Sequence, residues 1–281
     1  KNGRGMDVTV LADRGLDIPA LYYKGVNLAL NNKVAVSSPY LYHEDGGREF
    51  VRHFYGGLLT TCGLTYAGSS TDDDGRALGV HGRADHIPAE NVSAGTEYDG
   101  DEAVLRVRGQ EREARAFGEH LRLTREITLR TESNCLEIHD IIENLGFVTA
   151  PLMMIYHINF GYPMLDTGAM VYVNSGKMEP RTDFAREKMG TWDLIEEPEP
   201  GREEQCYFHT QFPDEDAFAM LHNEKLGLAA AVRFDPRKLP LLCQWKMMCE
   251  GDYALGLEPT TSGVASREDS RKQGILQFVE P

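Results

Sequence analysis

Long apolar runs are absent from this sequence of 281 residues. Residues 150–156 form one of the longest, far short of the roughly 20 apolar residues that a membrane-spanning helix needs. A basic-then-apolar leader is also missing, and the sequence opens on Lys1. We therefore expect no membrane contact, no signal peptide and a cytoplasmic location.

Cysteine is scarce, and the five that occur lie far apart without a C-x-x-C pair. Such an odd, scattered set indicates reduced thiols and makes a disulfide framework or a structural zinc site improbable. The five are Cys62, Cys135, Cys206, Cys243 and Cys249.

The usual cofactor and nucleophile signatures are missing as well. The sequence has no G-x-G-x-x-G turn between a strand and a helix, no G-x-x-x-x-G-K-[ST] loop and no G-x-S-x-G elbow. Nucleotide-binding, flavin-binding and serine-hydrolase functions therefore lose their support, and we expect no cofactor.

Positive charge is in short supply, with 29 Lys and Arg against 44 Asp and Glu and a net charge of −15. Such a balance repels polyphosphate and anionic lipid, so nucleic acid is not an expected partner. A hydrophobic content of 41% with 26% charged residues lies in the globular range.

Alternating apolar and polar residues dominate what is present. In residues 121–130, Leu121, Leu123, Ile127 and Leu129 would face one way and polar residues the other, which predicts a half-buried strand. Residues 150–160 are apolar on both faces, as in a central strand. A short helix is expected near 184–195, and exposed loops at 72–76 and 195–204. Further strands are predicted at 7–11, 103–108, 136–142, 170–173, 217–221, 228–234, 241–247, 253–258 and 275–279.

So many short strands, with no repeat and no break in composition, predict one all-β domain over residues 1–281. We expect an antiparallel sandwich with curved sheets. A concave sheet face is the natural binding site of such a fold.

Three polar residues stand in apolar or glycine-rich surroundings. His81 lies beside glycines that let a backbone approach a ligand, His157 lies within an apolar strand, and Glu258 ends another. A buried imidazole or carboxylate needs a partner or a cavity wall. Plainer interpretations stay open: a loop histidine, a satisfied core histidine and a glutamate that leaves the sheet into solvent.

A metal site is an alternative use of the histidines. His81, Asp85, His86 and Glu90 loosely resemble the H-x-H-x-x-x-E ligand run of cupin barrels. Alternate strand positions must differ by two residues to point at one ion, whereas His81 and His86 are five apart. We therefore expect no metal here.

Six segments, in order, carry a family resemblance: residues 13–18, 54–64, 80–83, 156–163, 239–246 and 256–259. Together they resemble the galactose mutarotase or aldose 1-epimerase superfamily, in particular its little-characterised aldose 1-epimerase-like branch. The resemblance implies a β-supersandwich in which Glu258 is the general base, His157 the general acid and His81 a group near the sugar ring oxygen. It also implies that Arg52 contacts sugar hydroxyls.

The chemistry suits these residue types. Interconverting the anomers of an aldose needs one group to take the C1 hydroxyl proton while another protonates the ring oxygen. A carboxylate and an imidazole can do this without a cofactor. Groups that hold hydroxyls or stack on a sugar ring are expected at Arg52, Lys246 and Trp245. An anionic sugar could be surrounded by Arg48, Arg52, Arg83 and Lys246.

Two questions stay open at this stage. The small-molecule sugar could be neutral or anionic, and the protein could be a non-catalytic carbohydrate-binding module with the same cleft. A homodimer is also left open.

Overall fold

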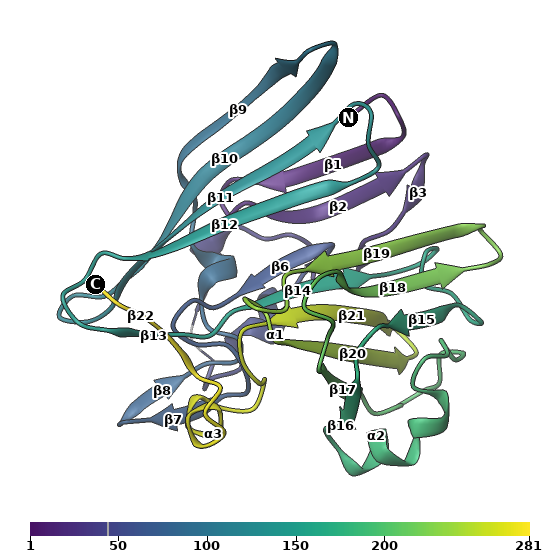
Figure 1. Ribbon diagram of the computed structural model, residues 1–281. Helices are drawn as coiled ribbons and strands as arrows, with labels where there is room; N and C mark the ends of the chain where they lie inside the picture. Colours follow the sequence, from purple (N-terminus) through teal and green to yellow (C-terminus); the bar gives the residue numbers. More distant parts are fainter. Residues whose placement is uncertain (44) are drawn as a thin grey trace.

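The computed structural model describes residues 1–43 and 45–281, and it is built almost entirely from antiparallel strands (Figure 1). Its largest unit is a nine-stranded sheet in which β3 (Val26–Asn27) pairs with β2 off the main path. The main path runs in the order β1 (Met6–Leu11), β2 (Asp17–Tyr23), β6 (Leu59–Cys62), β14 (Ile155–Phe160), β21 (Asp252–Thr260), β20 (Leu241–Cys249), β17 (Gln205–Thr210) and β16 (Lys177–Pro180).

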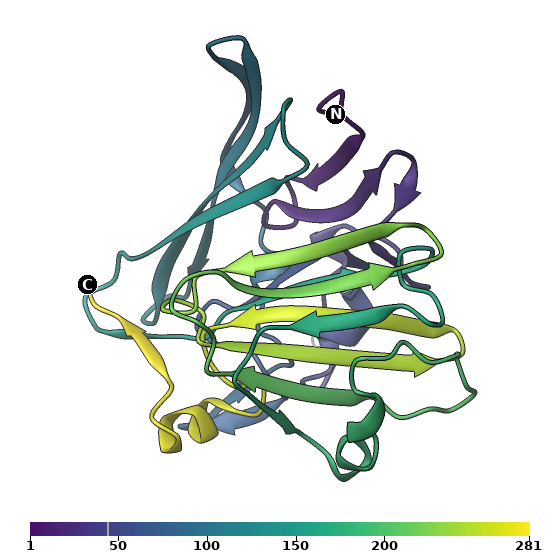
Figure 2. The ribbon, with the colours of Figure 1, turned by 45° about the vertical axis from the view of Figure 1, so that its right-hand side comes forward.

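Two smaller sheets accompany the large one (Figures 1 and 2). A four-stranded sheet has the order β12 (Leu136–Asn144), β11 (His120–Arg130), β10 (Glu102–Ala114) and β9 (Glu90–Asp99). A three-stranded sheet has the order β15 (Met170–Val173), β18 (Ala217–Asn223) and β19 (Leu228–Phe234).

The remaining elements are short. Three two-stranded pairs are β4 (Leu30–Asn31) with β5 (Gly56–Gly57), β7 (Thr71–Asp73) with β8 (Arg76–Leu78), and β13 (Ala150–Leu152) with β22 (Gln277–Val279). The helices are η1 (Pro39–Leu41), α1 (Glu49–His53), η2 (Ala84–His86), α2 (Asp183–Glu187), η3 (Met189–Thr191) and α3 (Arg267–Lys272). None of the helices within residues 1–43 and 45–281 is long and apolar enough to span a bilayer.

One face of the nine-stranded sheet carries the main core. Ile127 on β11, Leu221 on β18 and Leu257 on β21 belong to the same buried cluster, so both smaller sheets pack on this face. Leu121, Leu123, Ile127 and Leu129 are all buried, as the alternation of residues 121–130 predicts. Thr124, Arg125 and Thr128 are buried too, so the strand is covered more fully than the expected half-buried strand. The all-β, antiparallel supersandwich is thereby confirmed.

A buried ionic network joins the four-stranded sheet to the large one. Arg125 on β11 binds Asp17 on β2 at 3.2 Å and Asp140 on β12 at 2.7 Å. Thr61 accepts a further hydrogen bond from Arg125, and Tyr156 donates to Asp140. Burial raises the pKa of Asp17 to about 7 although Arg125 acts to lower it. Such a network is costly to desolvate, and its hydrogen bonds link strands of both sheets.

Some local expectations need correction. Residues 150–160 form two strands instead of one, since β13 leaves the large sheet to pair with β22. Residues 72–76 belong to the β7–β8 hairpin, where Asp73 is buried against Arg267. The segment 195–204 is not wholly exposed either, because Ile195 and Arg202 are buried. The expected helix near 184–195 is present as the short pair α2 and η3.

Candidate active site

The second face of the nine-stranded sheet brings His157 and Glu258 together. Asn159 on β14 pairs with Gly256 on β21, so two steps along these antiparallel strands His157 stands opposite Glu258. Directly opposed residues share one face of a sheet. Nδ1 of His157 lies 3.3 Å from Oε1 of Glu258, and both side chains are buried.

His81 reaches the same place from the loop between β8 and η2. Its backbone is held by two hydrogen bonds, from the His81 amide to the Gly68 carbonyl and from the Gly63 amide to the His81 carbonyl. The next residue, Gly82, has a φ of +77° and lies so close to Tyr66 that a side chain would collide with its carbonyl. The His81 and His157 rings are consequently 5.7 Å apart between centroids and nearly perpendicular.

Aromatic rings surround His157 on the same face. The ring centroid of Phe54 lies 5.0 Å from that of His157, and the Trp245 ring lies 5.6 Å away. Phe50 on α1 packs against His81 at 4.8 Å. Phe54 and Trp245 are only partly buried, so this aromatic wall has an open side.

The proton on His157 is positioned by Asn159. The amide nitrogen of Asn159 donates to the Gly56 and His157 carbonyls, which leaves its Oδ1 as an acceptor 2.6 Å from Nδ1 of His157. Nδ1 is therefore assigned as the protonated nitrogen, and Nε2 is left for a ligand. Burial lowers the pKa of His157 to about 4, although the bond to Asn159 acts to raise it.

Glu258 is a carboxyl group in an apolar setting. Burial, helped by the neighbouring Cys206, raises its pKa well above the usual range, while a bond from Cys243 acts to lower it. The Sγ atoms of Cys206 and Cys243 lie 3.0 Å apart beside it. Oε1 of Glu258 and Nδ1 of His81 are buried, and neither has a hydrogen-bond partner among the described residues. Buried polar atoms without partners are rare, and each needs an explanation such as a water, an ion or a catalytic role.

The family described as domain of unknown function DUF4432 matches residues 1–281. The chain belongs to this family. No curated protein matches this DUF4432 member.

Solved structures place the DUF4432 protein in the galactose mutarotase superfamily. A candidate aldose 1-epimerase from Klebsiella pneumoniae is 26% identical, with a TM-score of 0.94 over 100% of this chain and 74% of that one. A galactose mutarotase-like protein from Clostridium acetobutylicum is 14% identical, with a TM-score of 0.67 over 99% and 89%. A candidate aldose 1-epimerase from Escherichia coli is 13% identical, with a TM-score of 0.59 over 99% and 95%. These last two show the fold alone.

Two charged residues that the sequence analysis missed lie at the rim of the DUF4432 site. Arg181 follows β16, donates to the Ser69 hydroxyl at 3.1 Å and lies 3.6 Å from Glu204. Glu204 in turn accepts a hydrogen bond from the Trp245 indole at 3.0 Å. The charge of Arg181 acts to lower the pKa of His81, which burial brings to about 3. No periodic pattern in the sequence marks either residue, because both lie just outside strands.

Lys246 does not join this site, contrary to expectation. It follows Trp245 on β20 and therefore points to the opposite face of the sheet. There it is fully buried, and its ammonium group donates to the Thr191 and Leu194 carbonyls at 2.8 Å. Burial lowers the pKa of Lys246 to about 8. Its role in this DUF4432 protein is to hold the segment after α2 against the sheet.

The three predicted arginines are not gathered at the site either. Arg52 lies on the exposed side of α1, because the buried residues of this short helix occupy its inward side. There it pairs with Asp45. Arg48 is exposed at the start of α1. Arg83 is exposed, and its guanidinium lies 6.0 Å from the Tyr42 ring centroid. The expectation that they line the site is therefore not supported by their placement.

The metal alternative finds no support in the placement of its residues. Nδ1 of His86 lies 2.6 Å from Asp85. Glu90 lies on the exposed strand β9 and pairs with Arg112 of β10. Within the described parts of the chain, no group of three or more His, Cys, Asp or Glu side chains is arranged to hold a metal ion.

Proposed function

We propose that this protein is an aldose 1-epimerase-like isomerase that interconverts the anomers of a free or modified aldose by general acid and base catalysis. The observation that supports it most is the unpartnered Oε1 of buried Glu258, 3.3 Å from the buried imidazole of His157. An acid and a base side by side in a desolvated site are what ring opening requires.

In the proposed reaction, Glu258 takes the proton of the C1 hydroxyl while His157 gives a proton to the ring oxygen. The bond between C1 and the ring oxygen breaks, the aldehyde rotates about the bond from C1 to C2, and the ring closes with the two roles reversed. One proton enters and one leaves the pair in ring opening, and the same exchange in reverse during ring closure restores both groups. His81, with its unpartnered Nδ1, would bind an oxygen of the same sugar.

The opposite pKa shifts fit this exchange. In the free site, burial favours a protonated Glu258 and a neutral His157. A sugar hydroxyl that donates a hydrogen bond to Glu258 stabilises its carboxylate form. The proton that Glu258 holds in the free site then moves to His157. Phe54 and Trp245 would pack on the apolar face of the ring, and Arg181 with Glu204 would bind its hydroxyls.

Exchange NMR between the α and β anomers of several neutral aldoses and uronic acids tests the proposal. We expect faster exchange than in buffer for at least one sugar, and a loss of about a hundredfold or more in Glu258→Gln. Glu111→Gln is the matched control, because Glu111 is also a buried carboxyl without a hydrogen-bond partner among the described residues but lies on β10. No acceleration with any sugar would refute the enzyme.

The second candidate, a carbohydrate-binding module, rests on the same aromatic wall. It predicts saturable sugar binding with anomer exchange no faster than in buffer. Glu258→Gln would then leave the exchange rate unchanged, so calorimetric titration beside the exchange measurement separates the two functions.

A further inference from the structure

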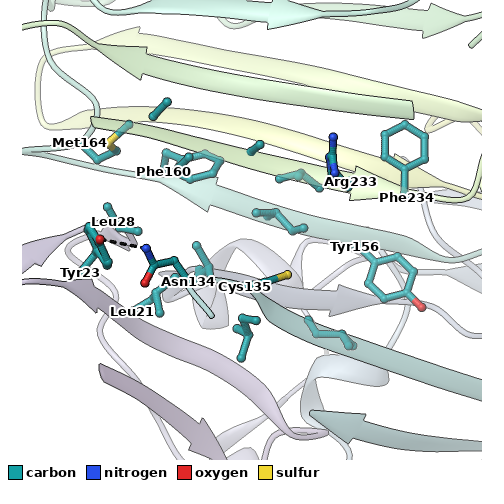
Figure 3. A pocket seen from close by; sticks show the side chains of 18 of the residues that line it. Leu21, Tyr23, Leu28, Asn134, Cys135, Tyr156, Phe160, Met164, Arg233 and Phe234 are labelled. Carbon is teal, nitrogen blue, oxygen red and sulfur yellow. Dashed lines mark hydrogen bonds between the residues drawn. The ribbon is translucent and has the colours of Figure 1, made fainter. Parts of the chain in front are cut away.

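The two faces of the nine-stranded sheet differ at β14. On one face, Tyr156, Ile158 and Phe160 line a largely apolar cavity of about 820 Å³ (Figure 3). His157 and Asn159 lie between them along the strand and therefore face the candidate active site. The floor of that site is accordingly built from alternate residues of β14 and of the strands beside it, β21 and β20.

Two rows of facing residues make up this floor, with one residue from each strand in each row. The rows are Cys243, Glu258 and His157, and Trp245, Gly256 and Asn159. Directly opposed residues share one face of a sheet, so all six positions belong to the site. Five of them carry a side chain, whereas the middle position of the second row, Gly256, carries none.

The carboxyl group of Glu258 occupies the space above Gly256. A Cβ atom on Gly256 would overlap Oε1 of Glu258 and would lie 3.0 Å from its Cδ. The Glu258 side chain therefore extends back along β21, from its own row to the middle of the second row. In this position Oε1 is buried and lies 3.3 Å from Nδ1 of His157.

Backbone conformation does not account for a glycine at position 256. Gly256 is buried in the middle of β21, and its φ lies outside the left-handed region that favours glycine. Glycine inside a strand is less favourable than alanine, because it loses more backbone freedom on folding and packs no side chain. What the missing side chain provides here is space for the Glu258 carboxyl.

We infer that Gly256 is a positioning residue for Glu258. Because Gly256 has no side chain, the Glu258 carboxyl can lie over the middle of the site with Oε1 beside His157. This role rests on the proposed function only for its effect on the rate of anomer exchange. The place of the carboxyl also affects the stability of the fold, which can be measured without any sugar.

Gly256→Ala in the whole 281-residue chain tests the effect on the rate. The added methyl group displaces the Glu258 carboxyl, whereas the backbone of β21 can keep its conformation. We expect kcat for anomer exchange to fall about a hundredfold or more, as on loss of a general base, with little change in KM. Gly109→Ala is the matched control and should leave kcat unchanged. Gly109 is also buried in a strand, β10, and a methyl group there would meet only apolar side chains.

A double-mutant cycle gives a second readout that needs no activity. In the wild type, the methyl group of Gly256→Ala meets the Glu258 carboxyl and should lower the urea midpoint of unfolding. In a Glu258→Ala background this space is empty, so Gly256→Ala should leave the midpoint unchanged or raise it, as alanine in a strand does. Gly109→Ala should shift the midpoint by the same amount in both backgrounds.

Three results would overturn the role of Gly256. Gly256→Ala could keep the exchange rate of the wild type, it could lower the urea midpoint equally with and without the Glu258 side chain, or it could fail to fold in both backgrounds. A Gly256→Ala protein that folds only together with Glu258→Ala would support the role. If the wild type accelerates anomer exchange for no sugar, the proposed function fails, and the double-mutant cycle still decides whether Gly256 makes room for the carboxyl.

Discussion

Asn159 and His157 lie two residues apart on β14, with Oδ1 of the amide 2.6 Å from Nδ1 of the imidazole. This contact fixes which nitrogen of His157 is left for a ligand, and it opposes the effect of burial on the pKa of the ring.

Replacing Asn159 with aspartate should therefore change the protonation of His157. A carboxylate beside Nδ1 favours the imidazolium, so Asn159→Asp should raise the pKa of His157 from about 4 by about one unit or more. We expect the acidic limb of the pH–rate profile, and the NMR titration of the ring, to move to higher pH. Asn134→Asp, at an exposed position, is the control. An unmoved limb would mean that another group governs the acidic side.

Neighbouring residues of β20 should have separable effects. Trp245→Ala removes part of the aromatic wall and should raise KM about fivefold, since stacking of a ring is worth about 1 kcal/mol. Lys246→Met should leave KM unchanged and lower the free energy of unfolding by about 2 kcal/mol, because two partly buried carbonyls lose their donor. Steady-state kinetics and urea unfolding of both variants check the contrast. Equal effects on KM would contradict the opposite facing of the two side chains.

Asp73 should be essential to the packing of α3. It is buried between Arg267, at 3.0 Å, and Arg271, at 3.2 Å. Asp73→Ala leaves the buried Arg267 without its carboxylate and should lower the free energy of unfolding by about 3 kcal/mol. The exposed neighbour Asp72→Ala should change it by less than about 0.5 kcal/mol. Thermal and urea unfolding give the comparison.

Buried carboxyls should make the protein less stable as pH rises. Burial raises the pKa of Asp17 to about 7 and that of Glu111 well above its usual range. The folded state then binds more protons than the unfolded state. The contribution of these groups to the free energy of unfolding therefore falls as pH increases from about 4 through their folded pKa values. Glu111→Gln should therefore gain stability relative to the wild type between pH 4.5 and pH 8.

Urea midpoints at several pH values measure this difference. Carboxylates with lowered pKa values, such as Asp73, act in the opposite direction but are common to both proteins. Glu137→Gln, an exposed substitution on β12, should follow the wild type at every pH. A pH dependence of Glu111→Gln that matches the wild type would show that Glu111 is ionised in the folded state.

The fold could be predicted wherever apolar residues alternate along a strand. Residues 121–130 show this alternation and form β11, although polar residues of that strand are buried as well. β9 escaped prediction because all ten of its residues are exposed, so no apolar period marks it. The break between β13 and β14 was also hidden, since an apolar run looks the same whether or not the chain changes sheet.

The candidate site was only partly predictable, for a related reason. His157 and Glu258 stand out as polar residues in apolar strands, and the structure places them side by side. Arg52 was predicted from the family resemblance and Lys246 from its residue type, and neither ground says which way the side chain points in this fold. Arg181 and Glu204 come from segments 23 residues apart that only the folded sheet brings together.

The two kinds of site residue differ in where they are anchored. β14 and β21, which carry His157 and Glu258, lie in the middle of the nine-stranded sheet, whereas Arg181 follows its last strand, β16. A library of variants at residues 177–181 and 204 could therefore alter which sugar is accepted while the central strands keep the reacting groups in register. Directed evolution of this protein would best begin at that edge.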